Sequence, residues 1–352
     1  MKYLILFIFL IGCSTDIHIN QSDDYEFEII YNDFQNPWGF DFIDENTLLI
    51  TERLGNVILF DLETKNKIYL EGVPEVDVVG QGGLLDIKYH EGWIYLTYSK
   101  SNGDGYATHL GRGFFNNDIE NFETLKIAEP FMSGGAHFGS RIVIRDDFVY
   151  FSTGDRGQKN FDANHVSQDL NNYLGSIIRL NKDGSNAEIF TYGHRNVQGM
   201  TLNSKTNEIW ITDHGERDGD SISILTEGGN YGWPIAHYGC RYGTNIPVSE
   251  DPHLNPDVID PVYFWECGSG GFPPSGMTFY YGDKFENWQG NLFVGNLAGQ
   301  YLGRFIIDES VIEAEPLLSY LGLRIRNVKE SPNGYLYALS DSGELIKIKP
   351  LQ

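Results

Sequence analysis

Three short apolar runs in the middle of the chain decide the fold: Gly199-Met200-Thr201-Leu202, Glu208-Ile209-Trp210-Ile211-Thr212 and Ile222-Ser223-Ile224-Leu225. Each run is only four or five residues long and is separated from the next by Gly, Asn, Asp or Ser. Runs of this length, rich in β-branched and aromatic residues and bounded by turn formers, predict β-strands rather than helices. The order is an apolar strand, a polar turn, a second strand that ends in Ser or Thr, and a further strand.

The same order recurs along the chain. The other copies begin at Gly39-Phe40-Asp41-Phe42, Gly83-Leu84-Leu85-Asp86-Ile87, Gly139-Ser140-Arg141-Ile142-Val143, Gly276-Met277-Thr278-Phe279 and Ile325-Arg326-Asn327-Val328. Six copies of three or four strands each predict an all-β chain folded as a six-bladed β-propeller. A β-sandwich is the alternative, but it would not repeat one order six times. Residues 25–31 have no unit of their own, and we expect them to complete the last blade and close the ring.

The first residues predict export. Residues 4–11 are apolar and follow Lys2, which is typical of a signal peptide and too short to span a bilayer. The run ends at Gly12-Cys13, which resembles the lipobox of bacterial lipoproteins and implies a lipid-anchored Cys13 on the periplasmic face of a membrane. Ser14 carries no acidic retention signal, which favours the outer membrane. An ordinary signal peptide with a chance cysteine is the alternative. We therefore predict a signal peptide over 1–12, a polar tether over 13–24 and a propeller domain over 25–352.

The net charge and the cysteine content limit the partners and the cross-links that we expect. The formal net charge of −24 argues against nucleic acid as a partner, because phosphate binding needs a basic surface. No other stretch is apolar enough to cross a membrane, so the lipid is the expected membrane contact. Without Cys13, the cysteines left are Cys240 and Cys267. An even pair in an oxidising compartment predicts a disulfide, with two free thiols as the alternative.

The blade geometry predicts where polar residues meet. The first strand of each blade lines the central channel, so the residues just before it converge at one end of the channel. Read through the copies, this position holds Trp38, Gln81, His137, Arg195 with Asn196, Ser275, and Arg324 with Arg326. Several arginines beside amides and a histidine predict a pocket for an anionic ligand. Scattered charges at a solvated channel opening are the alternative.

Two further features point to chemistry. His137 follows Gly134-Gly135-Ala136, and Asp155 lies one strand further on, where it could orient the imidazole and raise its basicity. A structural or merely exposed histidine is the alternative. Residues 213–220 contain clustered acidic side chains and glycines, a composition that suits Ca²⁺ but that an acidic surface loop would also have. No Gly-rich turn between a strand and a helix suggests a nicotinamide cofactor.

Five motifs together resemble the soluble aldose sugar dehydrogenases of the glucose/sorbosone dehydrogenase family: Gln81-Gly82-Gly83-Leu84-Leu85, His137-Phe138-Gly139-Ser140-Arg141, Ser152-Thr153-Gly154-Asp155-Arg156-Gly157, Tyr192-Gly193-His194-Arg195-Asn196-Val197-Gln198-Gly199 and Asn230-Tyr231-Gly232-Trp233-Pro234. The resemblance runs from about residue 36 to residue 348. It implies an oxidoreductase on a six-bladed propeller that uses pyrroloquinoline quinone (PQQ) and Ca²⁺ to oxidise an aldose at C1. It also implies an electron acceptor in the periplasm or the membrane.

The resemblance assigns a role to each matching position. It implies that His137 is the general base, that Asp155 orients it and that Arg195 stabilises the developing quinone oxyanion. Further cofactor contacts fall on Gln81, Asn196, Arg324 and Arg326, and calcium ligands fall on the carbonyl groups of Gly215 and Glu216, on Asp220 and on Tyr231.

The sequence departs from the family pattern at two places. A lysine that contacts the cofactor in glucose-oxidising relatives is replaced by Ala298. The loop 236–274, which carries both cysteines and Tyr263, Phe264 and Trp265, is long, and its aromatic residues suit either sugar stacking or a core within the loop. Two other functions stay open: a calcium-dependent six-bladed lactonase, which would want carboxylate and Asn ligands on the channel axis, and a propeller that binds a ligand without the cofactor.

Overall fold

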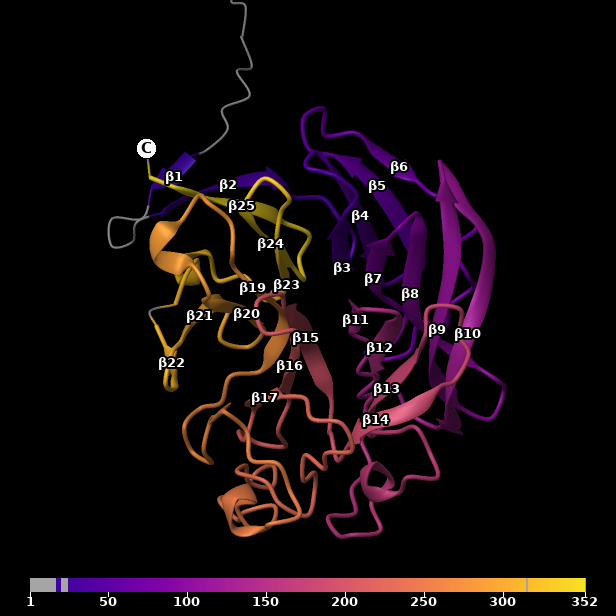
Figure 1. Cartoon of the computed structure of the whole chain (residues 1–352), viewed down its shortest axis with the longest axis vertical. Helices are drawn as coiled ribbons and strands as arrows, with labels where there is room; N and C mark the ends of the chain where they lie inside the picture. The colour runs from indigo at the N-terminus through magenta and orange to yellow at the C-terminus, as the bar shows by residue number, and fades with distance from the viewer. Residues whose placement is uncertain (1–16, 20–24, 315, 352) are drawn as a thin grey trace, which may run out of the picture.

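The computed structural model describes residues 17–19, 25–314 and 316–351, with backbone only for 17–19. Six small antiparallel sheets stand around a central channel, and the described helices are single 3₁₀ turns. Figure 1 shows the first strand of each sheet near the middle and the later strands toward the rim. The predicted all-β, six-bladed β-propeller is confirmed.

Blades 1 to 5 each contain four consecutive strands. Blade 1 contains β3 (Pro37–Phe42), β4 (Thr47–Glu52), β5 (Asn56–Asp61) and β6 (Lys67–Tyr69), and blade 2 contains β7 (Leu84–His90), β8 (Trp93–Ser101), β9 (Tyr106–Asn116) and β10 (Asp118–Met132). Blade 3 contains β11 (Ile142–Arg145), β12 (Phe148–Ser152), β13 (Ser176–Asn181) and β14 (Glu188–Tyr192), and blade 4 contains β15 (Val197–Asn203), β16 (Glu208–Asp213), β17 (Ser221–Ile224) and β18 (Tyr263–Phe264). Blade 5 contains β19 (Pro274–Phe279), β20 (Leu292–Asn296), β21 (Tyr301–Ile307) and β22 (Val311–Glu313). The 3₁₀ turns are η1 (Val166–Gln168), η2 (Pro252–Leu254), η3 (Glu286–Trp288) and η4 (Ser319–Leu321).

The sixth blade closes the ring with both ends of the chain. It contains β23 (Ile325–Glu330), β24 (Leu336–Ser340) and β25 (Leu345–Pro350), and β25 pairs antiparallel with β2 (Tyr25–Tyr31). The predicted closure by residues 25–31 is confirmed. A short strand β1 (Ile17–Ile19) then pairs with β2, so this part of the predicted tether belongs to the sheet. Cys13 and the predicted signal peptide lie outside the described residues.

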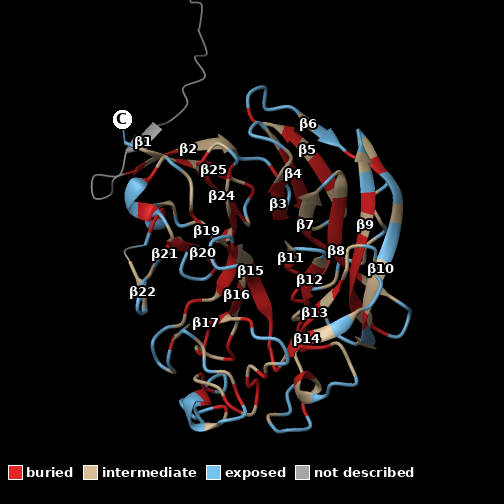
Figure 2. Ribbon diagram, in the orientation of Figure 1, coloured by how far each residue is buried: buried red, intermediate tan, exposed pale blue. Residues whose placement is uncertain are grey.

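The apolar core is divided among the junctions between blades. Each of six large clusters joins side chains of two neighbouring blades, as Ile50 of blade 1 does with Leu339 of blade 6, and Val197 of blade 4 with Tyr150 of blade 3. Figure 2 shows these strands buried and the rim exposed, notably along β10. Since each blade buries both of its faces, its strands read as continuous apolar runs in the sequence.

One buried arginine fills the channel axis. Arg141 pairs with Asp86 of β7 at 3.1 Å and donates to the carbonyl oxygens of Gln198 (2.6 Å) and Arg326 (3.0 Å). Its guanidinium also reaches Ser275 Oγ at 3.3 Å and lies 3.9 Å from the ring centre of Trp38. A single side chain that follows the third blade's Gly139 thus contacts the first strand of every other blade.

The second blade is longer than the repeat predicts. The sequence pattern identified its first two strands, but β9 and β10 span 11 and 15 residues, with three register shifts between them. Within the described part of the chain, no helix is long and apolar enough to cross a bilayer.

Candidate active site

A cavity of about 310 Å³ opens at the end of the channel where the first strands begin. Its lining includes seven of the side chains predicted to converge: Trp38, Gln81, His137, Arg195, Asn196, Arg324 and Arg326. Ser275, which was also expected here, is buried below and donates to the carbonyl oxygen of Arg326 at 2.7 Å. The volume lies at the lower end of the range for small-molecule sites. We call this space the arginine-lined cavity.

His137 and Asp155 form a tight pair beside the cavity. His137 Nδ1 lies 2.6 Å from Asp155 Oδ1, and the carboxylate is fully buried. A carboxylate can only accept, so Nδ1 carries the hydrogen and Nε2 is the ring atom that is able to take a proton. Burial raises the pKa of Asp155, but the hydrogen bond and charge of His137 outweigh it and hold that pKa below its ordinary value.

The backbone of His137 is held in an unusual conformation. Its φ of 51° lies in the left-handed region, which is uncommon for residues other than Gly, although His, Asn and Asp adopt it more often than the rest. Gln81 stabilises this turn because its Oε1 accepts the His137 backbone N–H at 2.8 Å. Gly154 packs against the same turn, and a Cβ there would lie 2.2 Å from the His137 carbonyl oxygen. Small neighbours and one amide therefore fix the direction of the imidazole.

Four arginines give the cavity its charge. Arg324 and Arg326 both bind Asp341, at 2.9 and 2.5 Å, and Arg53 joins them from blade 1. Arg195 is nine-tenths buried and donates to Glu216 at 2.8 Å. Burial opposes its charge, but Asp155 and Glu216 raise the pKa of Arg195 overall. The Nε atoms of Arg53 and Arg195 are buried and have no hydrogen-bond partner among the described residues.

The loop 213–220 lies directly behind Arg195. Among the described residues, the carbonyl oxygens of Gly215 and Glu216 accept no hydrogen bond, as expected of groups that could face a cation. Asp220, by contrast, accepts from the backbone of Gly215 (3.0 Å) and Phe272 (2.9 Å), and burial raises its pKa to about 6. The Tyr231 hydroxyl donates to the Ile224 carbonyl oxygen at 2.6 Å.

The described part of the chain holds no cluster of three or more His, Cys, Asp or Glu side chains suited to a metal. The carbonyl groups of Gly215 and Glu216 have no hydrogen-bond donor among the described residues, whereas the side chains of Asp220 and Tyr231 have structural hydrogen bonds of their own. Calcium ligation by these four residues stays a prediction.

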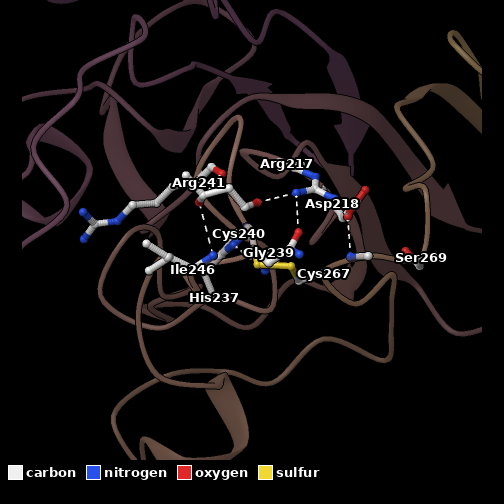
Figure 3. The surroundings of a disulfide bond; sticks show 12 residues. Arg217, Asp218, His237, Gly239, Cys240, Arg241, Ile246, Cys267 and Ser269 are labelled. Atoms are coloured by element: carbon white, nitrogen blue, oxygen red, sulfur yellow. Dashed lines mark hydrogen bonds and ion pairs between the residues drawn. A yellow bond between two sulfur atoms is a disulfide. The ribbon is translucent and has the colours of Figure 1, made fainter.

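The long loop 236–274 is pinned beside this site. Cys240 and Cys267 form a disulfide, which confirms the predicted pairing. Figure 3 shows it next to Arg217, whose backbone pairs with that of Cys240 through two hydrogen bonds of 2.9 Å. Trp265 stacks on Phe272 and is nine-tenths buried, so its ring belongs to a core and does not face the cavity. Tyr242 is the residue of this loop that lines the cavity, and it is 62% exposed.

Comparison with known proteins shows which family this chain resembles. The glucose/sorbosone dehydrogenase family matches residues 34–347. The chain belongs to this family. It is 35% identical to the aldose sugar dehydrogenase YliI of Escherichia coli, over 92% of each chain. The apo crystal structure of the soluble aldose sugar dehydrogenase from E. coli covers 93% of this chain and 100% of its own, with a TM-score of 0.85 and 33% identity. The PQQ-bound aldose sugar dehydrogenase of Streptomyces coelicolor shares the fold, with a TM-score of 0.73 at 23% identity over 91% and 96% of the two chains.

The family resemblance did not identify every residue that lines the cavity. Arg53, His214, Leu297 and Asp341 each follow directly after the second strand of a blade. The second strand runs antiparallel to the first, so the residue after it lies beside the residues that precede the first strand. Comparing the ends of the second strands would have found all four. Ala298, by contrast, is exposed in the turn after β20, next to Leu297.

Proposed function

We propose that this protein oxidises aldose sugars at the C1 hydroxyl to lactones, with PQQ as cofactor and calcium beside it. The observation that carries the proposal is the His137–Asp155 pair at the edge of a cavity lined by four arginines. Membership of the glucose/sorbosone dehydrogenase family and the names of its relatives support it.

The residues of the cavity fit PQQ. The cofactor carries three carboxylates, and arginine forks bind carboxylates through paired, charge-assisted hydrogen bonds. The Nε atoms of Arg53 and Arg195 are buried donors without an acceptor in the described part of the chain, and a bound anion would supply one. Gln81, Asn196, Arg324 and Arg326 would hold the cofactor with them. Arg53 adds a positive group to the cavity lining, which does not include Ala298, the residue at the position where a lysine is expected.

His137 acts as the base. Oxidation of the C1 hydroxyl to a lactone removes a proton from its oxygen and a hydride from C1. When bound, PQQ supplies the hydride acceptor. His137 Nε2 takes the proton, and Asp155, bonded to Nδ1, stabilises the imidazolium that forms. Arg195 lies in the cavity with a positive charge that two buried carboxylates maintain, so it can stabilise negative charge as it develops. Calcium would bind at the carbonyl groups of Gly215 and Glu216.

Two other functions fit less well. A calcium-dependent lactonase would need carboxylate ligands on the axis, but the axis holds Arg141 and the described cavity lining contains Asp341 alone as an acid. A binding module without cofactor would not need a buried His–Asp pair or a histidine in a strained conformation. Ala298 is the feature that favours this second alternative.

We also propose that the protein works at the periplasmic face of a bacterial membrane, anchored through Cys13. It would pass electrons from the reduced cofactor to an acceptor in the periplasm or the membrane. The support is the lipobox-like sequence at residues 10–13. Mass spectrometry of the mature protein would find a diacylated Cys13, and an unmodified cysteine would refute the anchor.

Reconstitution tests the function. Adding PQQ and Ca²⁺ to the purified apo-protein should change the cofactor absorbance and give dye-linked oxidation of aldoses. His137→Ala should lower the rate by roughly 10²- to 10⁴-fold while the absorbance change persists. His253→Ala, at an exposed histidine, is the matched control. No absorbance change and no activity over a broad panel of sugars would refute the proposal.

A further inference from the structure

We propose that Trp233 is a positioning residue for the His137–Asp155 pair, through an indole hydrogen bond to the carboxylate. The two oxygens of Asp155 have different partners. Oδ1 accepts from His137 (2.6 Å) and from the backbone of Gly157 (2.8 Å), whereas Oδ2 accepts from Trp233 Nε1 at 2.8 Å. The catalytic meaning of this contact rests on the proposed function, but the hydrogen bond itself does not.

The indole is fixed in place by the surrounding structure. Trp233 is 2% exposed, and its backbone N–H donates to the Gly193 carbonyl oxygen at 2.8 Å. Its own carbonyl oxygen accepts from Ser167 Oγ and Gln168 Nε2, both at 2.7 Å. These contacts come from η1 and from the segment just before Arg195. A donor held this firmly defines one orientation of the Asp155 carboxylate.

The same ring also contacts the active-site arginine. The Arg195 guanidinium carbon lies 5.3 Å from the Trp233 ring centre, within the range of a cation–π interaction. Arg195 and Asp155 are therefore linked twice: their backbones are joined by a 2.8 Å hydrogen bond, and their side chains contact one indole. Trp233 thus couples the position of the base to that of the charge-stabilising arginine.

Removing the indole N–H leaves Oδ2 without a strong donor. The nearest remaining group is His165 Nε2, at 3.6 Å, which is beyond hydrogen-bond distance. The carboxylate would then rotate or concentrate its charge on Oδ1. Rotation misaligns His137, and greater charge on Oδ1 favours the protonated imidazole, which cannot act as a base.

Several titratable or charged groups face this pair. They are Arg195 and Glu216 from the fourth blade, His165 from η1, Arg156 beside Asp155, His214 in the cavity lining, and His237, whose ring centre lies 5.0 Å from that of Trp233. Burial lowers the pKa of both His165 and His214, so both are neutral near pH 7. The charge of Arg195 is balanced by Glu216.

Trp233→Phe removes the N–H and keeps an aromatic ring. With PQQ and Ca²⁺, we expect kcat to fall roughly 10- to 100-fold with KM unchanged. The acid limb of the pH–rate profile should move up by about half to one unit. Trp210→Phe is the matched control, because the Trp210 Nε1 is buried without a hydrogen-bond partner among the described residues. Wild-type activity, or a lower rate with an unmoved profile, would overturn the proposal.

One measurement does not depend on turnover. Replacing Trp233 by benzothienylalanine keeps the bicyclic shape, removes the donor and avoids an overpacked or collapsed site. NMR titration of the His137 ring in the apo-protein should then give a midpoint shifted to higher pH, and an unchanged midpoint would refute the positioning role. If the wild-type protein has no activity with PQQ, the proposed function fails, while this titration still decides the role of Trp233.

Discussion

Replacing Arg141 by methionine tests whether one side chain at the channel axis stabilises the whole ring. Methionine keeps an unbranched apolar stem but removes the guanidinium. The substitution takes away the ion pair with Asp86, two hydrogen bonds to carbonyl oxygens and the stacking on Trp38. These partners lie on the first strands of different blades, so the loss affects several junctions at once.

The expected loss in the free energy of unfolding follows from the buried carboxylate that remains when Arg141 is removed. Asp86 is 4% exposed, and without Arg141 it keeps the backbone N–H of Ile142 as its strongest partner. Breaking a buried pair by removing one charge costs about 3–5 kcal/mol, because the other charge stays desolvated. Burial lowers the pKa of Arg141 only to about 10, so Arg141 is charged at pH 7. We therefore expect Arg141→Met to lower the free energy of unfolding by about 3–5 kcal/mol.

Urea unfolding at pH 7, followed by tryptophan fluorescence and by circular dichroism, measures this value where the two transitions coincide. Asp86→Asn removes the charge of the other partner, and the double variant completes a thermodynamic cycle. The double variant should lose about 2 kcal/mol less than the sum of the single losses. A loss below about 1 kcal/mol for Arg141→Met, or additive losses in the cycle, would refute the reasoning.

Three further predictions concern other parts of the ring. Asp41 is buried between Lys88 (2.9 Å) and Lys329 (3.1 Å). Burial raises the pKa of Asp41, but the two lysines outweigh burial and hold this pKa below its ordinary value. The stabilisation by the Asp41 carboxylate is therefore present above pH 4 and is lost as the pH falls through the lowered pKa. Asp41→Asn should cost about 2–4 kcal/mol in urea at pH 7 and flatten the loss of stability below pH 4; an unchanged acid profile would contradict this. Replacing both Cys240 and Cys267 by serine should lower the stability by about 3–4 kcal/mol, measured against the oxidised wild type, and an equal melting temperature would count against it. Tyr242→Ala should raise the aldose KM roughly two- to tenfold with kcat maintained, and an unaltered KM across the sugar panel would exclude a stacking role.

The sequence was informative where a repeat fixed the geometry. Six copies of a strand pattern predicted the blades, and one position read through all copies predicted seven of the side chains that line the cavity, because the propeller places equivalent positions at one end of the channel. The closure by β2 followed from a strand left without a unit.

The sequence was silent where contacts depend on packing between distant segments. Arg53 and Asp341 follow the second strands of their blades, whereas the repeat pattern pointed to the residues just before the first strands. Trp233 and Tyr242 lie in the long connection between β17 and β18 of the fourth blade. The contact between Trp233 Nε1 and Asp155 joins residues that are 78 positions apart. No periodicity encodes it. The aromatic triplet 263–265 was ambiguous for the same reason: only packing shows that Trp265 is covered by Phe272.

Counting arginines overstates the positive charge of the cavity. Arg324 and Arg326 share Asp341, and Arg195 is balanced by Glu216 and lies near Asp155, so carboxylates already neutralise much of this charge. Arg53 makes no ion pair among the described residues, and its Nη2 donates hydrogen bonds to the carbonyl oxygens of Gly80 and Gly82. The chain as a whole has a formal charge of −24, which does not attract an anion, and the interactions of exposed charges are largely screened beyond a Debye length of about 8 Å. An anionic ligand would therefore be held by directed N–H donors at contact distance, not by long-range attraction. On this reasoning Arg53, which lines the cavity and has no ion pair among the described residues, is the arginine whose charge is most available to an anionic ligand.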